Sequence, residues 1–339
     1  MKQHKKNTNS MLPFVSLCTP TFNRRPFIPF MIKCFEHQTY PKDKIEWIII
    51  DDGTDPIEEL VKHIPQVKYF YYEEKMLLGK KRNLMHTKCS GDIIIYMDDD
   101  DYYPSERISH AVETLQQNPT YLIAGSSKMY IYFNSRNQVY QCGPYKQYHS
   151  TAATFAFRKE LLIQTKYDDE IALAEEHKFT KGYTIPLIQL NSFKTILVFS
   201  HKHNSLNKEK LLENPEQTRT FPSCYTVDDF VKEPILKQFY MYDMNTLLDK
   251  YELGKPEHKP KLLEQILIME EKRKQMEEKR IENNKILQPN FKNESVNNNI
   301  ITLRNEYETK LSDKNILINE LLKKIKQLTQ ELSVFKSKS

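Results

Sequence analysis

Short apolar runs alternate with polar connections along the first part of the chain, and two of them frame a strand–helix–strand unit. Residues 14–18 (FVSLC) and 45–50 (IEWIII) are such runs, and their composition predicts buried strands. Between them, apolar residues at 26–38 recur near helical spacing, which predicts a helix that ends before Pro41. Two strands joined through a helix by short connections imply parallel pairing with a right-handed crossover.

The same alternation continues through the middle of the chain. Further strands are predicted at 67–72, 93–97, within 121–133, at 151–157 and at 195–199, and helices at 57–63, 80–88 and 158–165. The run at 93–97 (IIIYM) is apolar without interruption, so we expect it at the centre of the sheet. Alternating strands and helices predict an α/β fold, a Rossmann-like mixed sheet flanked by helices.

Changes in this pattern divide the chain into four regions. Residues 1–12 are polar and basic and predict a disordered tail, and 13–205 form the α/β domain. Residues 206–258 are polar and contain prolines, which predicts a loop and helical extension. From 259 to 339 the chain is rich in Glu, Lys, Gln, Asn and Ile, and we expect a helical arm separate from the α/β domain.

Two series of apolar residues recur in this last region. The first is a partial heptad of Leu262, Ile266, Met269 and Met276, and the second recurs every seven residues at Leu311, Ile318, Ile325 and Leu332. A heptad repeat is the pattern of a coiled coil, so the sequence predicts a coiled-coil arm that assembles a homo-oligomer. A solvated single helix is the alternative.

Composition narrows the class of protein. The chain has 339 residues and a net charge of +5, which is too mild to indicate a nucleic-acid partner. Its 5 cysteines are scattered without paired spacing, which predicts a reducing, cytoplasmic compartment and neither a disulfide framework nor a zinc site. No apolar run is long enough to predict a signal peptide or a membrane span.

Acidic residues follow two of the predicted strands directly. The run at 93–97 leads into Asp98–Asp101, and the run at 45–50 leads into Asp51–Asp52. Adjacent like charges repel unless a cation or solvent compensates them, and a hard divalent ion prefers such oxygen ligands. The alternatives are a solvated acidic turn and, for Asp51–Asp52, a turn before a helix cap at Asp55–Pro56. Because both acidic runs follow strands of one sheet, we favour the metal site.

Donor groups are expected at the same edge of the sheet. The first strand ends in Thr19–Arg24, which places hydroxyl, amide and guanidinium groups where ligands of open α/β sheets bind. A predicted helix opens with the cations of 80–83 (KKRN). Cations are unfavourable at a helix start unless an anion binds there. A bound phosphate would explain them, as would ordinary surface lysines.

Four segments in this order resemble the signatures of family-2 glycosyltransferases with the GT-A fold. They are VSLCTPTFNR, IEWIIIDDGT, GKKRN and YMDDDDYYPSER, followed by FAFR and AEEH. The resemblance covers roughly residues 13–205 and implies a GT-A catalytic domain, with a nucleotide-binding half to about residue 104 and an acceptor half after it. It further implies an inverting enzyme of the hexosyltransferase type. Such an enzyme uses a nucleotide-diphosphate sugar, with a UDP-sugar favoured, and Mn²⁺ or Mg²⁺, and its acceptor is a hydroxyl of a glycan, protein or other molecule.

The resemblance also implies roles for the matching residues. Donor-binding positions are Pro20, Thr21, Asn23, Arg24, Asp52, Lys80, Arg82, Asp98 and Asp99. Among them, Asp52 would accept from the nucleotide base, and Thr21 and Arg24 would flank the base and ribose.

In the DxD element of this family, Asp100 would be the main metal ligand, with Asp98 and Asp101 beside it. A histidine after the strand at 195–199 would complete the site, with His203 the first choice and His201 the second. Ordinary surface histidines are the alternative.

A catalytic base is expected in the acidic stretch that follows. Five carboxylates occur within the nine positions 168–176. An inverting transfer needs one carboxylate to take the proton of the attacking hydroxyl. The family places an Asp where this chain has Glu176, so we assign the base to Glu176 and an orienting or acceptor contact to Glu175. A charged helix start is the alternative.

Two other functions remain open from the sequence. A sugar-phosphate nucleotidyltransferase also uses an α/β fold with metal carboxylates, but it needs a glycine-rich phosphate loop, and the first strand here is followed by TPTFNRR. A non-catalytic scaffold organised by the coiled coil is the third possibility. The joint presence of Asp52, Asp98, Asp100 and Glu176 speaks against it.

Overall fold

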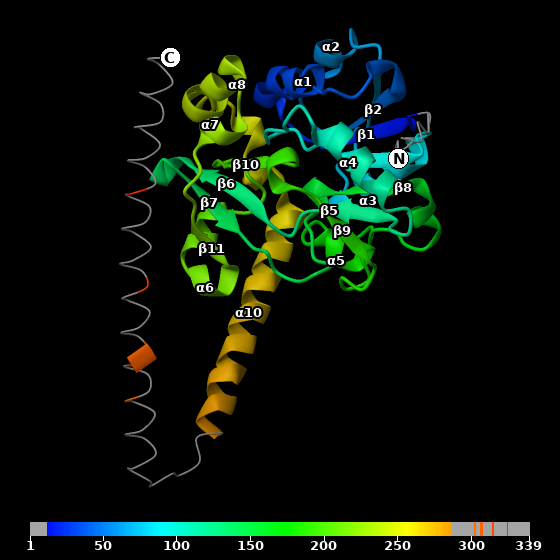
Figure 1. Ribbon diagram of the computed structural model, residues 1–339. Coiled ribbons are helices and arrows are strands. Elements are labelled where there is room, and N and C mark those ends of the chain that lie inside the picture. Colours follow the sequence, from blue (N-terminus) through cyan, green and yellow to red (C-terminus); the bar gives the residue numbers. More distant parts are fainter. Residues whose placement is uncertain (1–11, 287–301, 303–305, 308–313, 315–323, 325–339) are drawn as a thin grey trace. The chain divides into compact units, whose positions relative to one another are not determined.

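The computed structural model describes residues 12–286 and the single positions 302, 306, 307, 314 and 324. The strands are β1 (Val15–Thr21), β2 (Ile45–Asp51), β3 (Val67–Tyr71), β4 (Ile93–Tyr96), β5 (Ile123–Gly125), β6 (Met129–Phe133), β7 (Gln138–Cys142), β8 (Ala156–Arg158), β9 (Leu187–Gln189), β10 (Leu197–Ser200) and β11 (Thr220–Pro222). The α-helices are α1 (Ile28–Glu36), α2 (Glu58–Val61), α3 (Leu78–Lys88), α4 (Arg107–Gln117), α5 (Glu175–Phe179), α6 (Pro215–Thr218), α7 (Val227–Phe230), α8 (Pro234–Gln238), α9 (Met244–Asp249) and α10 (Pro260–Ile286) (Figure 1).

A seven-stranded mixed sheet forms the centre of the domain, in the order β3-β2-β1-β4-β8-β5-β9. Strands β1 to β4 pair in parallel, β8 is antiparallel to both β4 and β5, and β9 is parallel to β5. The predicted α/β fold with a mixed sheet is therefore confirmed. Because β1 and β4 are neighbours, the chain segments that follow them leave the sheet side by side.

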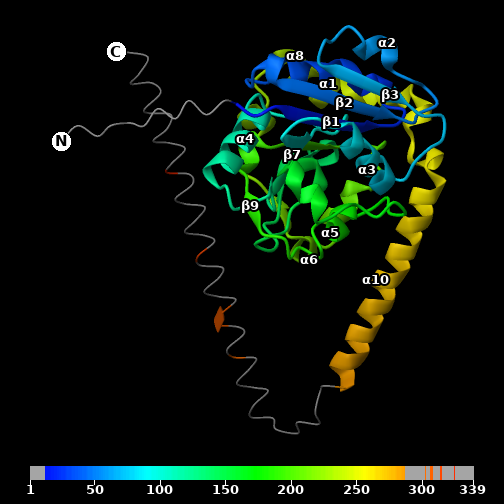
Figure 2. The ribbon, with the colours of Figure 1, turned by 90° about the vertical axis from the view of Figure 1, so that its right-hand side faces the viewer.

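Helices cover both faces of this sheet, which explains why its central strands are apolar without alternation. On one face, Leu17, Trp47 and Ile95 pack with the apolar residues of α1 and α4. On the other face, Ile48 and Tyr96 pack with residues of α3 and α5. Figure 2 shows α1 and α3 on opposite sides of the parallel strands.

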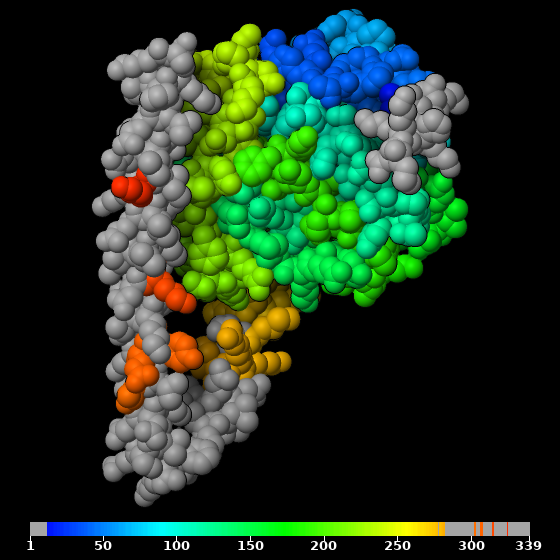
Figure 3. Space-filling view, in the orientation of Figure 1, coloured from blue at the N-terminus to red at the C-terminus, as the bar shows by residue number. Residues whose placement is uncertain are grey.

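A second sheet, in the order β10-β6-β7-β11, extends the domain. It is joined by the segment from α8 through a π-helical turn (Phe239–Asp243) to α9. Tyr240, which is fully buried, donates a hydrogen bond to the backbone oxygen of Asp101 at 2.8 Å. Residues 206–258 thus pack into the same compact unit as the α/β domain, and the segment around α7 and α8 contributes to the surface seen in Figure 3.

Two local expectations need correction. The predicted strand at 151–157 is a strand only at Ala156–Arg158, because a 3-10 turn occupies Ala152–Thr154. There the Thr154 hydroxyl accepts the backbone N–H of Ser126 at 2.9 Å, so this segment turns instead of extending. The predicted helix at 158–165 is a shorter 3-10 helix, Lys159–Ile163.

Helix α10 begins within the compact unit, which ends at Glu270; a second unit covers Glu271–Ser339. In the first heptad series Leu262 is buried, whereas Met276 is exposed. The second heptad series lies outside the described residues, so the coiled coil stays a prediction. Of the helices in the described ranges, none combines the length and the apolar character that a bilayer crossing requires.

Candidate active site

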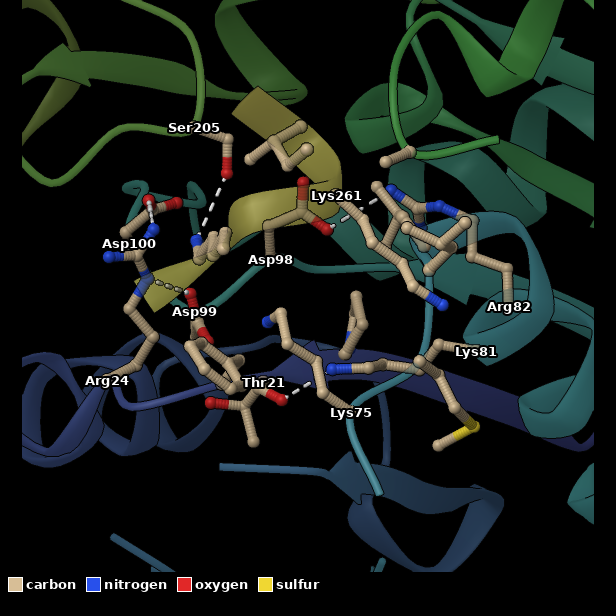
Figure 4. A pocket seen from close by; sticks show the side chains of 18 of the residues that line it. Thr21, Arg24, Lys75, Lys81, Arg82, Asp98, Asp99, Asp100, Ser205 and Lys261 are labelled. Carbon is tan, nitrogen blue, oxygen red and sulfur yellow. Dashed lines mark hydrogen bonds and ion pairs between the residues drawn. The ribbon is translucent and has the colours of Figure 1, made fainter. Parts of the chain in front are cut away.

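A cavity of about 320 Å³ lies at the carboxyl ends of β1 and β4. Its lining comes from widely separated parts of the chain: Pro20, Thr21, Phe22, Arg24, Lys75, Met76, Leu77, Leu78, Lys81, Arg82, Asp98, Asp99, Asp100, Ala172, Ser205, Lys259, Pro260, Lys261 and Leu262. Ligands of open α/β sheets bind at this edge. Figure 4 shows the acidic and basic side chains around the cavity.

The end of β1 contributes Pro20, Thr21 and Arg24 to the lining. Arg24 is buried and lies 3.5 Å from an Asp99 oxygen and 3.3 Å from an Asp100 oxygen. Asn23, by contrast, joins the end of β1 to the C-terminal extension, because its side-chain amide donates to the backbone oxygen of Leu253 at 2.9 Å. Of the four predicted donor-binding residues on this segment, three line the cavity and Asn23 supports it.

The start of α3 brings two cations to the cavity, the predicted Arg82 and also Lys81, which was not predicted. Lys81 is buried, and its Nζ donates to an oxygen of Asp52 at 2.5 Å and to the backbone oxygen of Thr21 at 2.7 Å. Lys80, the predicted residue, is exposed and does not line the cavity, whereas Lys81 is buried and does. Asp52 also accepts from the Met76 N–H at 2.7 Å and lies outside the cavity lining.

The four carboxylates after β4 have different surroundings. Burial alone would raise the pKa of Asp100, but the Arg24 guanidinium and a contact of 3.2 Å with His201 hold that pKa well below its usual range. Burial raises the pKa of Asp99 to about 7. Asp101 is not among the residues that line the cavity, and its carboxylate accepts the backbone N–H of Phe199 in β10 at 3.2 Å. Its role as a metal ligand stays a prediction.

Arg82 lies between the carboxylates that follow β4 and the acidic residues of α5. Its Nε donates to Glu175 at 3.0 Å, its Nη2 lies 3.7 Å from Asp98, and its guanidinium lies 4.3 Å from the Tyr96 ring centroid. Three buried polar atoms here have no hydrogen-bond partner among the described residues: Arg82 Nη1, Asp98 Oδ1 and Thr21 Oγ1. Buried polar groups are nearly always satisfied, so these atoms indicate a polar ligand.

The two predicted catalytic residues occupy the first turn of α5. Glu175 is buried against Arg82, whereas Glu176 has no cation partner among the described ion pairs. Burial, followed by the charge of Glu175, raises the pKa of Glu176 to about 7. The Tyr183 hydroxyl lies 3.5 Å from a Glu176 oxygen. Neither glutamate lines the cavity, but Ala172 just before them does.

The two histidines after β10 separate in the structure. His201 contacts Asp100, whereas His203 is buried outside the cavity lining, with both ring nitrogens unpartnered among the described residues. Strand β10 ends at Ser200, so the alternation that would place both rings on one face does not extend to them. His201, the second choice from the sequence, is the one that touches the acidic run.

Fewer of the predicted metal ligands line the cavity than we expected from the sequence. Within the described residues, no three His, Cys, Asp or Glu side chains gather as a metal cluster. Asp98 and Asp100 both line the cavity, and Asp98 Oδ1, although 3.7 Å from Arg82 Nη2, has no hydrogen-bond partner among the described residues. Two carboxylates on a cavity fit Mg²⁺ or Mn²⁺ by their chemistry, because these ions use few protein ligands.

Four lysines and one aromatic ring of the cavity were not predicted: Phe22, Lys75, Lys81, Lys259 and Lys261. Lys81 is adjacent to Lys80, which we predicted from the sequence. The sequence does not show which of the two side chains the helix directs to the cavity. Lys259 and Lys261 lie at the start of the predicted helical arm. The sequence there is highly charged, so nothing in it predicts that these side chains line a cavity.

Residues 16–173 match the family model described as Glycosyl transferase family 2. An uncharacterized glycosyltransferase of Haemophilus influenzae is 28% identical over 120 residues, which cover 34% of this chain and 47% of the relative. A GalNAc(5)-diNAcBac-PP-undecaprenol beta-1,3-glucosyltransferase of Campylobacter jejuni is 32% identical over 113 residues, covering 31% of this chain and 34% of that relative. The chain thus spans less than half the length of either relative.

Among solved structures, S. aureus TarS 1-349 in complex with UDP-GlcNAc is 20% identical with a TM-score of 0.47, covering 55% of this chain and 58% of that chain. The family match itself includes the ends of β1, β2 and β4, with Thr21, Asp52 and Asp98–Asp100. Residues 16–173 of the chain are therefore a glycosyltransferase domain of family 2.

Proposed function

We propose that the protein transfers a hexose from a nucleotide-diphosphate sugar, with a UDP-sugar favoured, to an acceptor hydroxyl with inversion at the sugar carbon. The observation that carries the proposal is the cavity at the strand ends of the family-2 domain. It combines cationic side chains with Asp98, Asp100 and unpartnered buried polar atoms. This combination suits a ligand that is both polar and multiply charged.

The cations of the cavity are suited to the donor's diphosphate. Departure of the sugar leaves negative charge on the diphosphate, and fixed positive groups stabilise it because they need no reorganisation. Asp98 and Asp100 would hold Mg²⁺ or Mn²⁺, which when bound neutralises part of that charge. Arg24 keeps Asp100 ionised, so that this carboxylate is available as a ligand.

Glu176 is suited to the proton transfer. The acceptor oxygen forms a bond to the sugar carbon while the bond from that carbon to the diphosphate oxygen breaks, and the acceptor proton passes to the Glu176 carboxylate. A base with a pKa near 7 combines availability with driving force at neutral pH. Glu175, fixed by Arg82, keeps a negative charge beside Glu176 and so helps to raise its pKa.

Donor binding tests the proposal directly. In a thermal-shift screen with Mn²⁺, we expect UDP, or else GDP or dTDP, to raise the melting temperature of the wild-type chain. Asp100→Asn should remove the metal-dependent part of that shift, because the neutral amide is a poor ligand for a hard cation. The matched control is Glu170→Gln, an exposed carboxylate outside the cavity, which should behave as wild type. No shift with any nucleoside diphosphate, with or without metal, would overturn the proposal.

A further inference from the structure

The far wall of the cavity comes from the C-terminal extension, well beyond the residues that match the family model. Lys259 and the first three residues of α10, Pro260, Lys261 and Leu262, all line it. Figure 4 labels Lys261 among them. Lys259 is only 7% exposed, and its Nζ donates to the Ser205 hydroxyl at 3.1 Å. The same ammonium lies 5.7 Å from the centroid of the Phe22 ring. This lysine is therefore part of the cavity wall and is largely shielded from solvent.

Hydrogen bonds fix the extension to the parts of the domain that form the site. The backbone oxygen of Gly254 lies 3.4 Å from Arg24 Nη1, next to the bond between Asn23 and Leu253 described above. Further along, the Gln265 side chain accepts from the Ala172 N–H at 2.9 Å and donates to the Glu170 backbone oxygen at 2.7 Å. The start of α10 is thus held between the end of β1 and the loop that leads into α5.

The charges around the cavity are not balanced within the protein. Arg24 is paired with Asp99 and Asp100, Lys81 with Asp52, and Arg82 with Glu175 and Asp98. In contrast, three cations of the lining pair with none of the described carboxylates, namely Lys75, Lys259 and Lys261. Burial, with the nearby charges of Arg24 and Lys75, lowers the pKa of Lys259 well below its usual range. A buried cation without a counterion is unfavourable, so this wall is suited to an anion.

We propose that Lys259 and Lys261 bind the diphosphate of the donor, so that the C-terminal extension completes the donor site of the family-2 domain. The inference rests on the proposed function and adds two binding residues to it. The positive end of the α10 dipole also favours a nearby anion. Backbone N–H groups contribute little to this, because Pro260 has none and those of Leu262 and Leu263 bond to the Lys259 backbone oxygen.

Calorimetry on the full-length chain tests the inference with three probes: inorganic pyrophosphate, UDP and uridine. Lys259→Gln and Lys261→Gln should each weaken pyrophosphate and UDP binding by about tenfold or more, since each removes a charged contact to phosphate. Uridine, which has no phosphate, should bind both variants as it binds wild type. Lys272→Gln, an exposed lysine further along α10, is the matched control and should leave all three affinities unchanged.

The outcomes separate the inference from the proposed function. If Lys261→Gln binds pyrophosphate and UDP as tightly as wild type does, the inference is overturned. Lys261 is exposed, so its substitution should not prevent folding, and this variant gives a result even if Lys259→Gln fails to fold. Pyrophosphate binding that depends on both lysines, without binding of UDP, GDP or dTDP, would keep the anion site and overturn the donor assignment. A wild-type chain that binds none of these probes would overturn both.

Discussion

At the scale of single residues, two adjacent glutamates have different chemistry because only one of them has a cation. The Glu175 side chain contacts Arg82 at 3.0 Å, whereas the Glu176 side chain contacts the Tyr183 hydroxyl at 3.5 Å. Burial and the charge of Glu175 therefore raise the pKa of Glu176 to about 7. A buried carboxylate next to another charge is a common arrangement for a catalytic base.

This difference predicts a pH profile. The base must be ionised to accept a proton, so kcat/KM should rise about tenfold per pH unit below about pH 7 and level off above it. Glu176→Gln should lower the transfer rate by about a hundredfold or more while leaving donor affinity close to wild type. Steady-state rates across the pH range, together with calorimetry, check both. A Glu176→Gln enzyme with full activity would remove the assignment.

Lys81 provides a second prediction at this scale, for stability. Its ion pair with Asp52 is almost fully buried, with 6% and 0% of the two side chains exposed. Lys81→Met leaves the Asp52 charge without its partner, so the free energy of unfolding should fall by about 3–5 kcal/mol. The double variant with Asp52→Asn should recover part of that loss, because both charges are then gone. Urea unfolding of the three variants measures this, and additive losses would contradict the pairing.

At the scale of elements, strands buried on both faces were the most predictable part of the fold. The run 93–97 is apolar at every position and the run 45–50 at every position except Glu46, so burial in a sheet is the arrangement that both runs favour. Prediction was weaker where a side chain hydrogen-bonds to the backbone and so interrupts a strand, as at Thr154. It was also weaker where the rotation of a helix decides which of two adjacent side chains lines the cavity. Lys80 and Lys81 differ by one position on α3, and only the packed helix shows which one enters the site.

The start of α10 carries the prediction for this scale. The sequence predicts an arm separable from the catalytic domain, but Leu262 is buried and four residues of this segment line the cavity. A chain that ends after Glu270, the limit of the compact unit, should retain UDP affinity, whereas one that ends after Gly254 should lose at least about tenfold. Calorimetry compares them, with circular dichroism to confirm that both are folded. Equal affinities would show that the segment contributes nothing to binding.

At the scale of the whole molecule, the mild net charge of +5 conceals a local concentration of positive charge. Lys75 is far in sequence from Lys259 and Lys261, and no short motif connects it to them. The acidic half of the site could be predicted because its residues follow strands directly. Arg24 and Arg82 were predicted too, but Lys259 and Lys261 could not be, because their position depends on where the extension packs.

The coiled-coil prediction belongs to this scale as well. We expect the full-length chain to sediment as a homo-oligomer and a chain ending after Glu270 to sediment as a monomer, because the predicted heptads lie after that point. Analytical ultracentrifugation over a range of concentrations distinguishes them. Identical masses would favour the solvated single helix.

The position of Lys259 and Lys261 outside the family-matched residues has a practical consequence for protein engineering. A chimera that receives only residues 16–173 from this chain would inherit the acidic strand ends and keep whatever wall its host provides. We therefore expect a chimera to bind the donor as this chain does only when it also receives the residues up to Glu270.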